Sequence, residues 1–216
     1  MELGLSWILW VAAWTAGLPA AVGGIKAPAS MSVPLISFGA LLLLLWVGRL
    51  RWLGSVLAAW GLVLWIAMPR PDLLIAESGG LVGVMTPQGR ALSKPAGDSF
   101  AAANWLEDDG DTGRQANACA REAFDREGRV VRFEIGGHSA LLATGKVAVA
   151  ALEGCGGAEI VISNQPLGPG RPCLTFDPWF LRTNGAVALS MDENGGLDMT
   201  TAREVSGRRL WTGLDQ

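Results

Sequence analysis

Few residues of this chain have the types and spacing that catalysis requires. The 216 residues include a single histidine, His138, which directly follows the glycine pair Gly136-Gly137. A Ser-His-Asp triad would have to use it, and a metal-assisted hydrolase needs several nitrogen or carboxylate ligands around one ion. Phosphate-binding and dinucleotide-binding glycine loops and a Gly-x-Ser-x-Gly turn are absent from the sequence. We therefore expect a non-enzyme with no catalytic residue, no cofactor site and no metal ligand, and we interpret His138 as an exposed turn residue.

The three cysteines, Cys119, Cys155 and Cys173, include no Cys-x-x-Cys pair. With one histidine they cannot complete a Cys/His zinc set. One interpretation is a disulfide between Cys155 and Cys173, which would close a loop containing three prolines if the domain lies in an oxidising compartment. Three unpaired thiols are the alternative.

Acidic residues gather in two places that a site might use. Residues 107–113 include Asp108, Asp109 and Asp111, but they lack the twelve-residue ligand pattern of an EF-hand. We therefore predict a solvated loop. Asp177 stands before Pro178 among apolar neighbours. We interpret it as a carboxylate that caps the following turn, with a site residue as the alternative.

The elements that would position these residues begin with two uncharged apolar runs. Residues 27–48 and 52–69 are 22 and 18 residues long, and the basic turn between them holds Arg49 and Arg51. A bilayer core of about 30 Å needs about 20 helical residues, and neither run shows a polar face. The pattern predicts a transmembrane helical hairpin. By the positive-inside bias, Arg49 and Arg51 place the turn in the cytoplasm and the following domain in the periplasm.

Residues 3–25 are also uncharged, with Trp7, Trp10 and Trp14 spaced to share one helical face. Indoles on one face are typical of a helix at a membrane interface. A signal peptide is the alternative, although no Lys or Arg precedes Lys26. We expect a membrane or interfacial helix over residues 1–26, the hairpin over 27–69 and one soluble α/β domain over 70–216.

Charge divides along the same boundary. The net charge of −3 is the sum of +3 for residues 1–71 and −6 for residues 72–216. Because phosphate neutralisation by a basic surface supplies most non-specific DNA affinity, the acidic domain is not expected to bind DNA by itself.

Alternating and buried-strand patterns fill this domain. Two glycines between apolar runs predict a β-hairpin, and short apolar runs predict further strands. A helix is expected over residues 99–106 after an Asp-Ser start. The predicted strands are 73–76, 81–86, 90–93, 130–135, 139–143, 146–151, 159–163, 186–191 and 197–202.

Taken in order, several short segments resemble the C-terminal part of the ComEC family of competence proteins, in its alphaproteobacterial form. Each segment is degenerate, but their order and spacing are specific, and together they cover essentially the whole chain. Besides the Trp-rich start and the hairpin with its Arg-Leu-Arg turn, they are 70–75, 80–84, 100–106, 109–111, 155–163, 173–177, 185–189 and 207–211.

This resemblance implies the C-terminal portion of a multi-pass inner-membrane channel that admits DNA as a single strand. It also implies a domain similar to the metallo-β-lactamase sandwich, with a degenerate site because the HxHxDH-type metal motif is missing. Expected partners are the membrane and other channel subunits or the missing N-terminal part of the same protein, with single-stranded DNA contacted only indirectly. The alternatives are a membrane-anchored periplasmic hydrolase with an unrecognised site and a truncated, vestigial copy.

Overall fold

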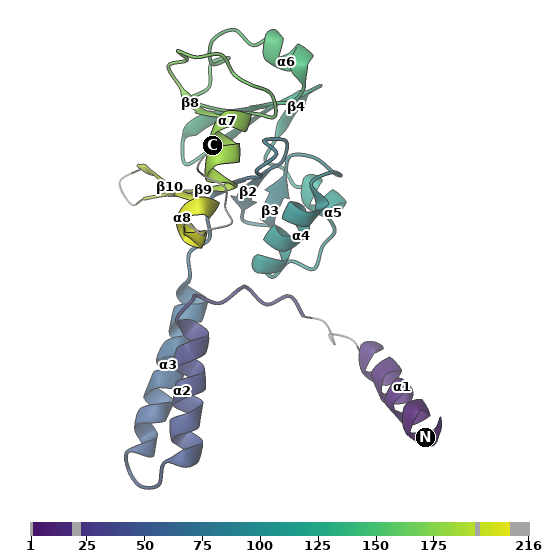
Figure 1. Cartoon of the computed structure of the whole chain (residues 1–216), viewed down its shortest axis with the longest axis vertical. Helices are drawn as coiled ribbons and strands as arrows, with labels where there is room; N and C mark the ends of the chain where they lie inside the picture. Colours follow the sequence, from purple (N-terminus) through teal and green to yellow (C-terminus); the bar gives the residue numbers. More distant parts are fainter. Residues whose placement is uncertain (1, 19–22, 193–194, 208–216) are drawn as a thin grey trace.

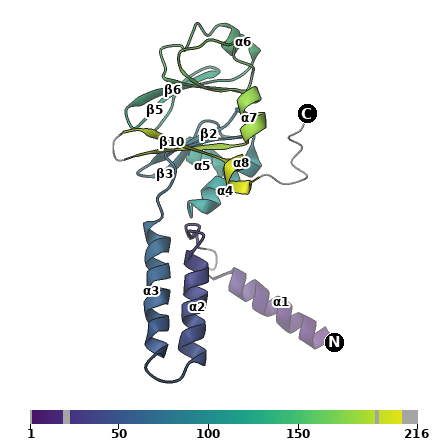
Figure 2. The same cartoon turned by 60° about the vertical axis from the view of Figure 1, so that its left-hand side comes forward.

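The computed structural model describes residues 2–18, 23–192 and 195–207. Helices α2 (Ser32–Leu45) and α3 (Arg51–Ala67) run side by side as an arm that projects from a two-sheet α/β domain (Figure 1). Helix α1 (Glu2–Ala16) stands apart from both in Figure 1 and in the turned view of Figure 2. Its three indoles do share a face, since the Trp7 ring lies 5.3 Å from that of Trp10, and the Trp10 ring 6.5 Å from that of Trp14.

Glycines allow the two helices of the hairpin to pack closely. A Cβ atom added to Gly54 of α3 would lie 2.5 Å from the carbonyl oxygen of Gly39 in α2. A Cβ atom added to Gly39 would lie 2.6 Å from the Gly54 oxygen, and one added to Gly61 would lie 2.9 Å from the Ser32 oxygen. Any larger residue at these positions would push the backbones apart, so the contact depends on glycine.

The prediction that this hairpin crosses a membrane is wrong. Within residues 2–18, 23–192 and 195–207, no helix combines the length and the apolar character that a bilayer crossing requires. The longest, α3, has 17 residues and rises about 26 Å at about 1.5 Å per residue, short of a core of about 30 Å. The sequence runs overstate the helices, because residues 27–31 and 46–48 lie outside α2.

Two further predictions fail with it. The membrane-spanning form of the helix predicted over residues 1–26 is wrong, because α1 has 15 residues; the interfacial form stays a prediction. The multi-pass inner-membrane location with a periplasmic domain depended on the same spans and is wrong for the same reason. Arg49 lies in the exposed turn and Arg51 begins α3. Their predicted role in orienting the chain stays untested.

The domain is built from two five-stranded sheets. Sheet A is antiparallel throughout, whereas sheet B becomes parallel where β6 meets β7 and β7 meets β8. In spatial order, sheet A contains β10 (Leu197–Thr201), β9 (Val187–Met191), β1 (Leu73–Ile75), β2 (Val82–Thr86) and β3 (Gly89–Leu92), and sheet B contains β4 (Asp125–Glu127), β5 (Val130–Ile135), β6 (His138–Ala143), β7 (Ile160–Ser163) and β8 (Leu174–Phe176).

The main core lies between the two sheets. Ile75 and Leu189 of sheet A and Ile162 and Phe176 of sheet B are fully buried in one apolar cluster. The outer face of sheet A packs against α4 (Ser99–Asp108) and α5 (Gln115–Cys119), and that of sheet B against α6 (Lys146–Ala150) and the loop that follows it. Helices α7 (Pro178–Asn184) and α8 (Ala202–Ser206) complete the domain. This architecture is compatible with the α/β part of the predicted fold.

Most of the predicted strands are confirmed, including the alternating β5 and the fully buried β7. The exception is the predicted strand at residues 146–151, which forms helix α6. A short apolar run does not distinguish a strand from a helix. Since β6 and β7 are parallel, the chain must cross over between them, and a helix is the usual connection.

The glycine contact in the hairpin gives a first prediction. Replacing Gly54 with Ala should cost about 1–3 kcal/mol of local stability, because the added Cβ overlaps the Gly39 backbone. Hydrogen exchange of the α2 and α3 amides should accelerate accordingly. Gly4→Ala in α1 is the matched control, since nothing lies within 4 Å of its added Cβ. Equal protection of α2 and α3 in wild type and in Gly54→Ala would contradict the argument.

Candidate functional site

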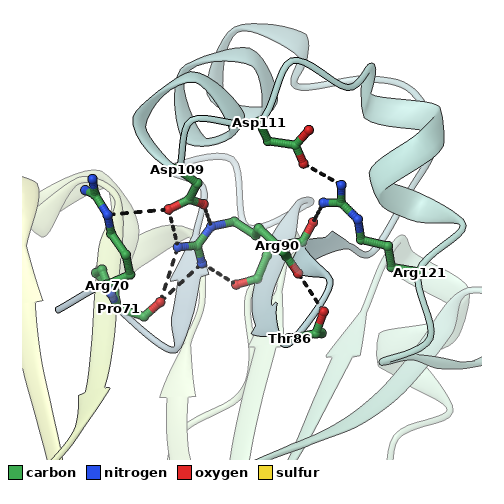
Figure 3. A network of polar contacts seen from close by, with 9 residues as sticks. Arg70, Pro71, Thr86, Arg90, Asp109, Asp111 and Arg121 are labelled. Carbon is green, nitrogen blue, oxygen red and sulfur yellow. Dashed lines mark hydrogen bonds and ion pairs between the residues drawn. The ribbon is translucent and has the colours of Figure 1, made fainter. Parts of the chain in front are cut away.

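A buried arginine at the base of the hairpin organises a network of polar contacts. Arg90 of β3 is 1% exposed, and its Nε donates to Asp109 Oδ2 at 2.5 Å while Nη2 reaches the second carboxylate oxygen at 3.3 Å (Figure 3). The same guanidinium donates to the Pro71 carbonyl oxygen at 3.3 Å. A buried charge is tolerated only when it is paired in this way.

Two more arginines extend this pair. Arg70 Nε lies 3.9 Å from Asp109 Oδ1, and Arg121 forms an ion pair with Asp111 and donates to the Arg90 carbonyl oxygen at 2.6 Å. Figure 3 shows these side chains in a row beneath the loop that follows α4. We call Arg70, Arg90, Asp109, Asp111 and Arg121 the junction network.

The prediction of a solvated acidic loop at residues 107–113 is therefore wrong for two of its carboxylates. The side chains of Asp109 and Asp111 are 8% and 18% exposed. Asp109 is paired with Arg90 of β3, and Asp111 with Arg121, which follows α5. The one sequence signal was Arg90, a lone charge within the apolar strand pattern at residues 90–93, which needs a buried partner.

The junction network also holds the hairpin. Arg70 Nη2 donates to the Ala27 carbonyl oxygen at 2.7 Å, and the Ala27 N–H donates to the Asp108 carbonyl oxygen at 2.8 Å. Trp65 of α3 donates its indole N–H to the Lys26 carbonyl oxygen at 2.7 Å. Both ends of the α2–α3 arm are thus fastened to the same corner of the domain, beside a cavity of about 780 Å³.

Local charges set the protonation of the loop. Burial raises the pKa of Asp108. The Arg70 charge acts to lower this pKa, and the Asp109 charge raises it further. Partial burial also acts to raise the pKa of Asp111, but hydrogen bonds from the Gly113 N–H and from Arg121 hold that pKa below its ordinary value. Asp109 and Asp111 are committed to guanidinium partners, an arrangement that fixes elements in place rather than one that transfers protons.

The sequence-predicted site residues lie elsewhere in the domain. A disulfide joins Cys155 to Cys173, with the Cα atoms 6.1 Å apart, while Cys119 is a free, half-buried thiol at the end of α5. Asp177 begins α7, and its carboxylate accepts hydrogen bonds from the Trp179 and Phe180 N–H groups, each at 3.1 Å. The capping interpretation of Asp177 is confirmed.

His138 begins β6, the central strand of sheet B, and bridges to Gly195 between β9 and β10 of sheet A. Its Nδ1 is 2.6 Å from Glu159 Oε2, and its Nε2 is 3.2 Å from the Gly195 carbonyl oxygen. The hydrogen bond to Glu159, followed by that to Gly195, raises the pKa of His138. In the part of the chain that the structure describes, no three His, Cys, Asp or Glu side chains are grouped to hold a metal ion.

No family model, no curated protein and no solved structure matches the chain. The resemblance to the ComEC family therefore stays a prediction from sequence.

The junction network predicts a large effect for Arg90→Met. The substitution leaves the buried Asp109 carboxylate without its main partner, so the free energy of unfolding measured in urea should fall by about 3–5 kcal/mol. The control Arg114→Met replaces an exposed arginine outside the network and should change it by less than about 0.5 kcal/mol. The double variant Arg90→Met/Asp109→Leu should recover part of the loss, because it also removes the isolated charge. Equal losses for the two single variants would contradict a central role for Arg90.

His138 gives a prediction about pH. Because its pKa is raised in the folded chain, the bridge contributes stability that is fully present below the unfolded-state pKa of about 6.5 and is lost as pH rises through the folded-state pKa. NMR titration of this single histidine should show the raised pKa, and Glu159→Gln should lower it. Glu127→Gln, at the other end of sheet B, is the control. An unchanged pKa in Glu159→Gln would rule out the bridge as the cause.

Proposed function

We propose that this chain is a non-catalytic module of a DNA-uptake assembly of the competence type, and that it binds a partner chain through the α2–α3 hairpin. The observation that carries the proposal is the apolar outer surface of that hairpin. Leu44 and Ile66 are each 81% exposed and Trp52 is 67% exposed. Large apolar side chains exposed along both helices are typical of an interaction site.

The kind of partner follows from what the hairpin surface contains. Helix α2 carries no charged side chain, and the only charged side chain of α3 is Arg51 at its first position. Such a surface gains most by packing against uncharged apolar helices, since any charge placed against it would lose its hydration. The competence resemblance supplies the candidates, namely channel subunits or the remaining part of the same protein.

The junction network supports a structural role for the domain in this assembly. Since Arg70 and Asp108 fasten the segment before α2 to the domain, a partner bound to the hairpin would hold the domain in a defined position. Asp109 and Asp111 are each paired with an arginine, which favours a structural role for this corner of the domain. Residues 72–216 carry a net charge of −6, so we propose that single-stranded DNA is contacted by the partner rather than by this domain.

Site-specific photocrosslinking tests the partner directly. A photoreactive residue at position 44 or 66 of the full chain, expressed in a naturally transformable host that carries the gene, should capture a competence-channel subunit identified by mass spectrometry. The same photoreactive residue at the exposed position 127 of the domain is the control and should not capture that subunit. Failure to recover a channel subunit from either hairpin position would overturn the proposed attachment.

Transformation measures the function itself. Deleting the gene should lower the uptake of transforming DNA, and the wild-type chain should restore it. A chain with Leu44→Glu and Ile66→Glu should not restore uptake, because the new charges would be buried against the partner, whereas Glu127→Gln should. Unchanged uptake after deletion would overturn the role in DNA uptake.

A further inference from the structure

A second cavity, of about 530 Å³, is lined by three cationic side chains: Lys94, Arg126 and Arg129. Of the described residues that line it, none is Asp or Glu. This contrasts with the acidic character of residues 72–216, whose net charge is −6. Three cations around one cavity without an acidic residue among the lining groups favour an anionic ligand.

Arg126 is held in place before any ligand arrives. Its Nε donates to the Ser93 carbonyl oxygen at 3.4 Å, and its Nη2 donates to the carbonyl oxygens of Leu92 and Cys119 at 3.2 and 2.9 Å. The guanidinium also stacks over the Phe124 ring, 5.3 Å from its centroid. Within the described residues its Nη1 makes no hydrogen bond, so this nitrogen is left to donate to a ligand.

The two other cations complete the cavity. The Lys94 ammonium forms an ion pair with Asp98 and lies 3.4 Å from the position of a Cβ on Gly80. Arg129 Nη1 lies 2.7 Å from the position of a Cβ on Gly145, and the Arg129 side chain makes no ion pair or hydrogen bond within the described residues. Since Asp98 balances Lys94, two uncompensated guanidinium groups remain at the cavity.

Part of the remaining wall is apolar. Ala116 and Ala120, from and just after α5, line the cavity with Pro95, and all three are exposed. Val131 and Leu142, from neighbouring strands of sheet B, also line it but are only 7% and 1% exposed. A volume of about 530 Å³ lies in the range of small-molecule sites, about 300–1,000 Å³. One side of the cavity is cationic and suits a phosphate, because guanidinium groups bind phosphate with two parallel hydrogen bonds. The other side is apolar and suits a planar ring.

We infer that this cavity binds a phosphate-bearing small molecule of the nucleoside monophosphate class. Arg126 and Arg129 bind the phosphate, and the apolar wall formed by the exposed residues Pro95, Ala116 and Ala120 packs against the base. This assignment goes beyond the proposed attachment of the chain to a partner, and it uses no residue of the hairpin or of the junction network.

Calorimetric titration of the full chain with deoxyadenosine 5′-monophosphate tests the inference. The nucleotide should bind, deoxyadenosine should show no measurable binding, and inorganic phosphate should bind more weakly than the nucleotide. Arg129→Gln should weaken nucleotide binding at least about tenfold, because it removes a charged donor. Arg114→Gln, which removes an exposed arginine outside the cavity, should leave the dissociation constant unchanged.

A second variant keeps the test independent of folding. Arg126→Lys should also weaken binding, because it keeps the charge but removes the planar guanidinium donors that bind the phosphate, and thermal unfolding of each variant without ligand should show that it is folded. An absence of nucleotide binding by the wild type would overturn the inference, as would an unchanged dissociation constant in folded Arg129→Gln. Equal affinity for inorganic phosphate and the nucleotide would overturn the assignment of the apolar wall to a base.

Discussion

The ion pair between Arg90 and Asp109 is the constraint on which the arrangement of hairpin and domain depends. Burying either charge alone costs several kcal/mol, so β3 and the end of α4 must stay together. The same guanidinium binds the Pro71 carbonyl oxygen, at the point where the chain passes from α3 into β1. One buried cation therefore fixes the positions of a strand, a helix end and the linker to the hairpin.

The two helices of the hairpin are held together by a different interaction. They meet at Gly39, Gly54 and Gly61, where backbone packs against backbone, so the large apolar side chains are displaced to the outside. Glycines occupy the contact between α2 and α3 and let the helices pack closely. The large apolar side chains therefore lie on the outer surface of the hairpin. An exposed Leu44 or Ile66 is thus a consequence of the sequence pattern.

The sequence predicted those elements whose signal is local. Alternation in β5, the glycine turn before His138 and the uninterrupted apolar run of β7 each depend on neighbouring residues, and all three are present in the structure. Run length was a poorer guide. It counted residues 27–31 and 46–48 as helical, although a proline-containing segment and the turn occupy them, and the membrane spans were wrong for that reason.

The contacts of the junction network were beyond such reasoning. Arg90 and Asp109 are separated by 19 residues, and no periodicity relates a strand residue to the residue after a helix. Asp177 was interpretable because its partners are two and three residues away. Acidic residues next to one another in sequence suggested hydration, yet the protein uses Asp109 and Asp111 to neutralise buried arginines. Whether a charge is solvated therefore depends on the opposite charge that the fold brings to it.

The arginines discussed above differ in whether a carboxylate balances their charge. Arg90 and Arg121 each face a carboxylate, so their charges are balanced within the fold and contribute to its stability. Arg126 is bound by carbonyl oxygens and an aromatic ring, which orient its guanidinium but leave its charge in place. The Arg126 guanidinium is oriented but its charge is not neutralised, and this orientation lowers the entropic cost of binding an anion. That difference is why the cavity at Arg126 and Arg129, and not the junction network, is the place for a ligand.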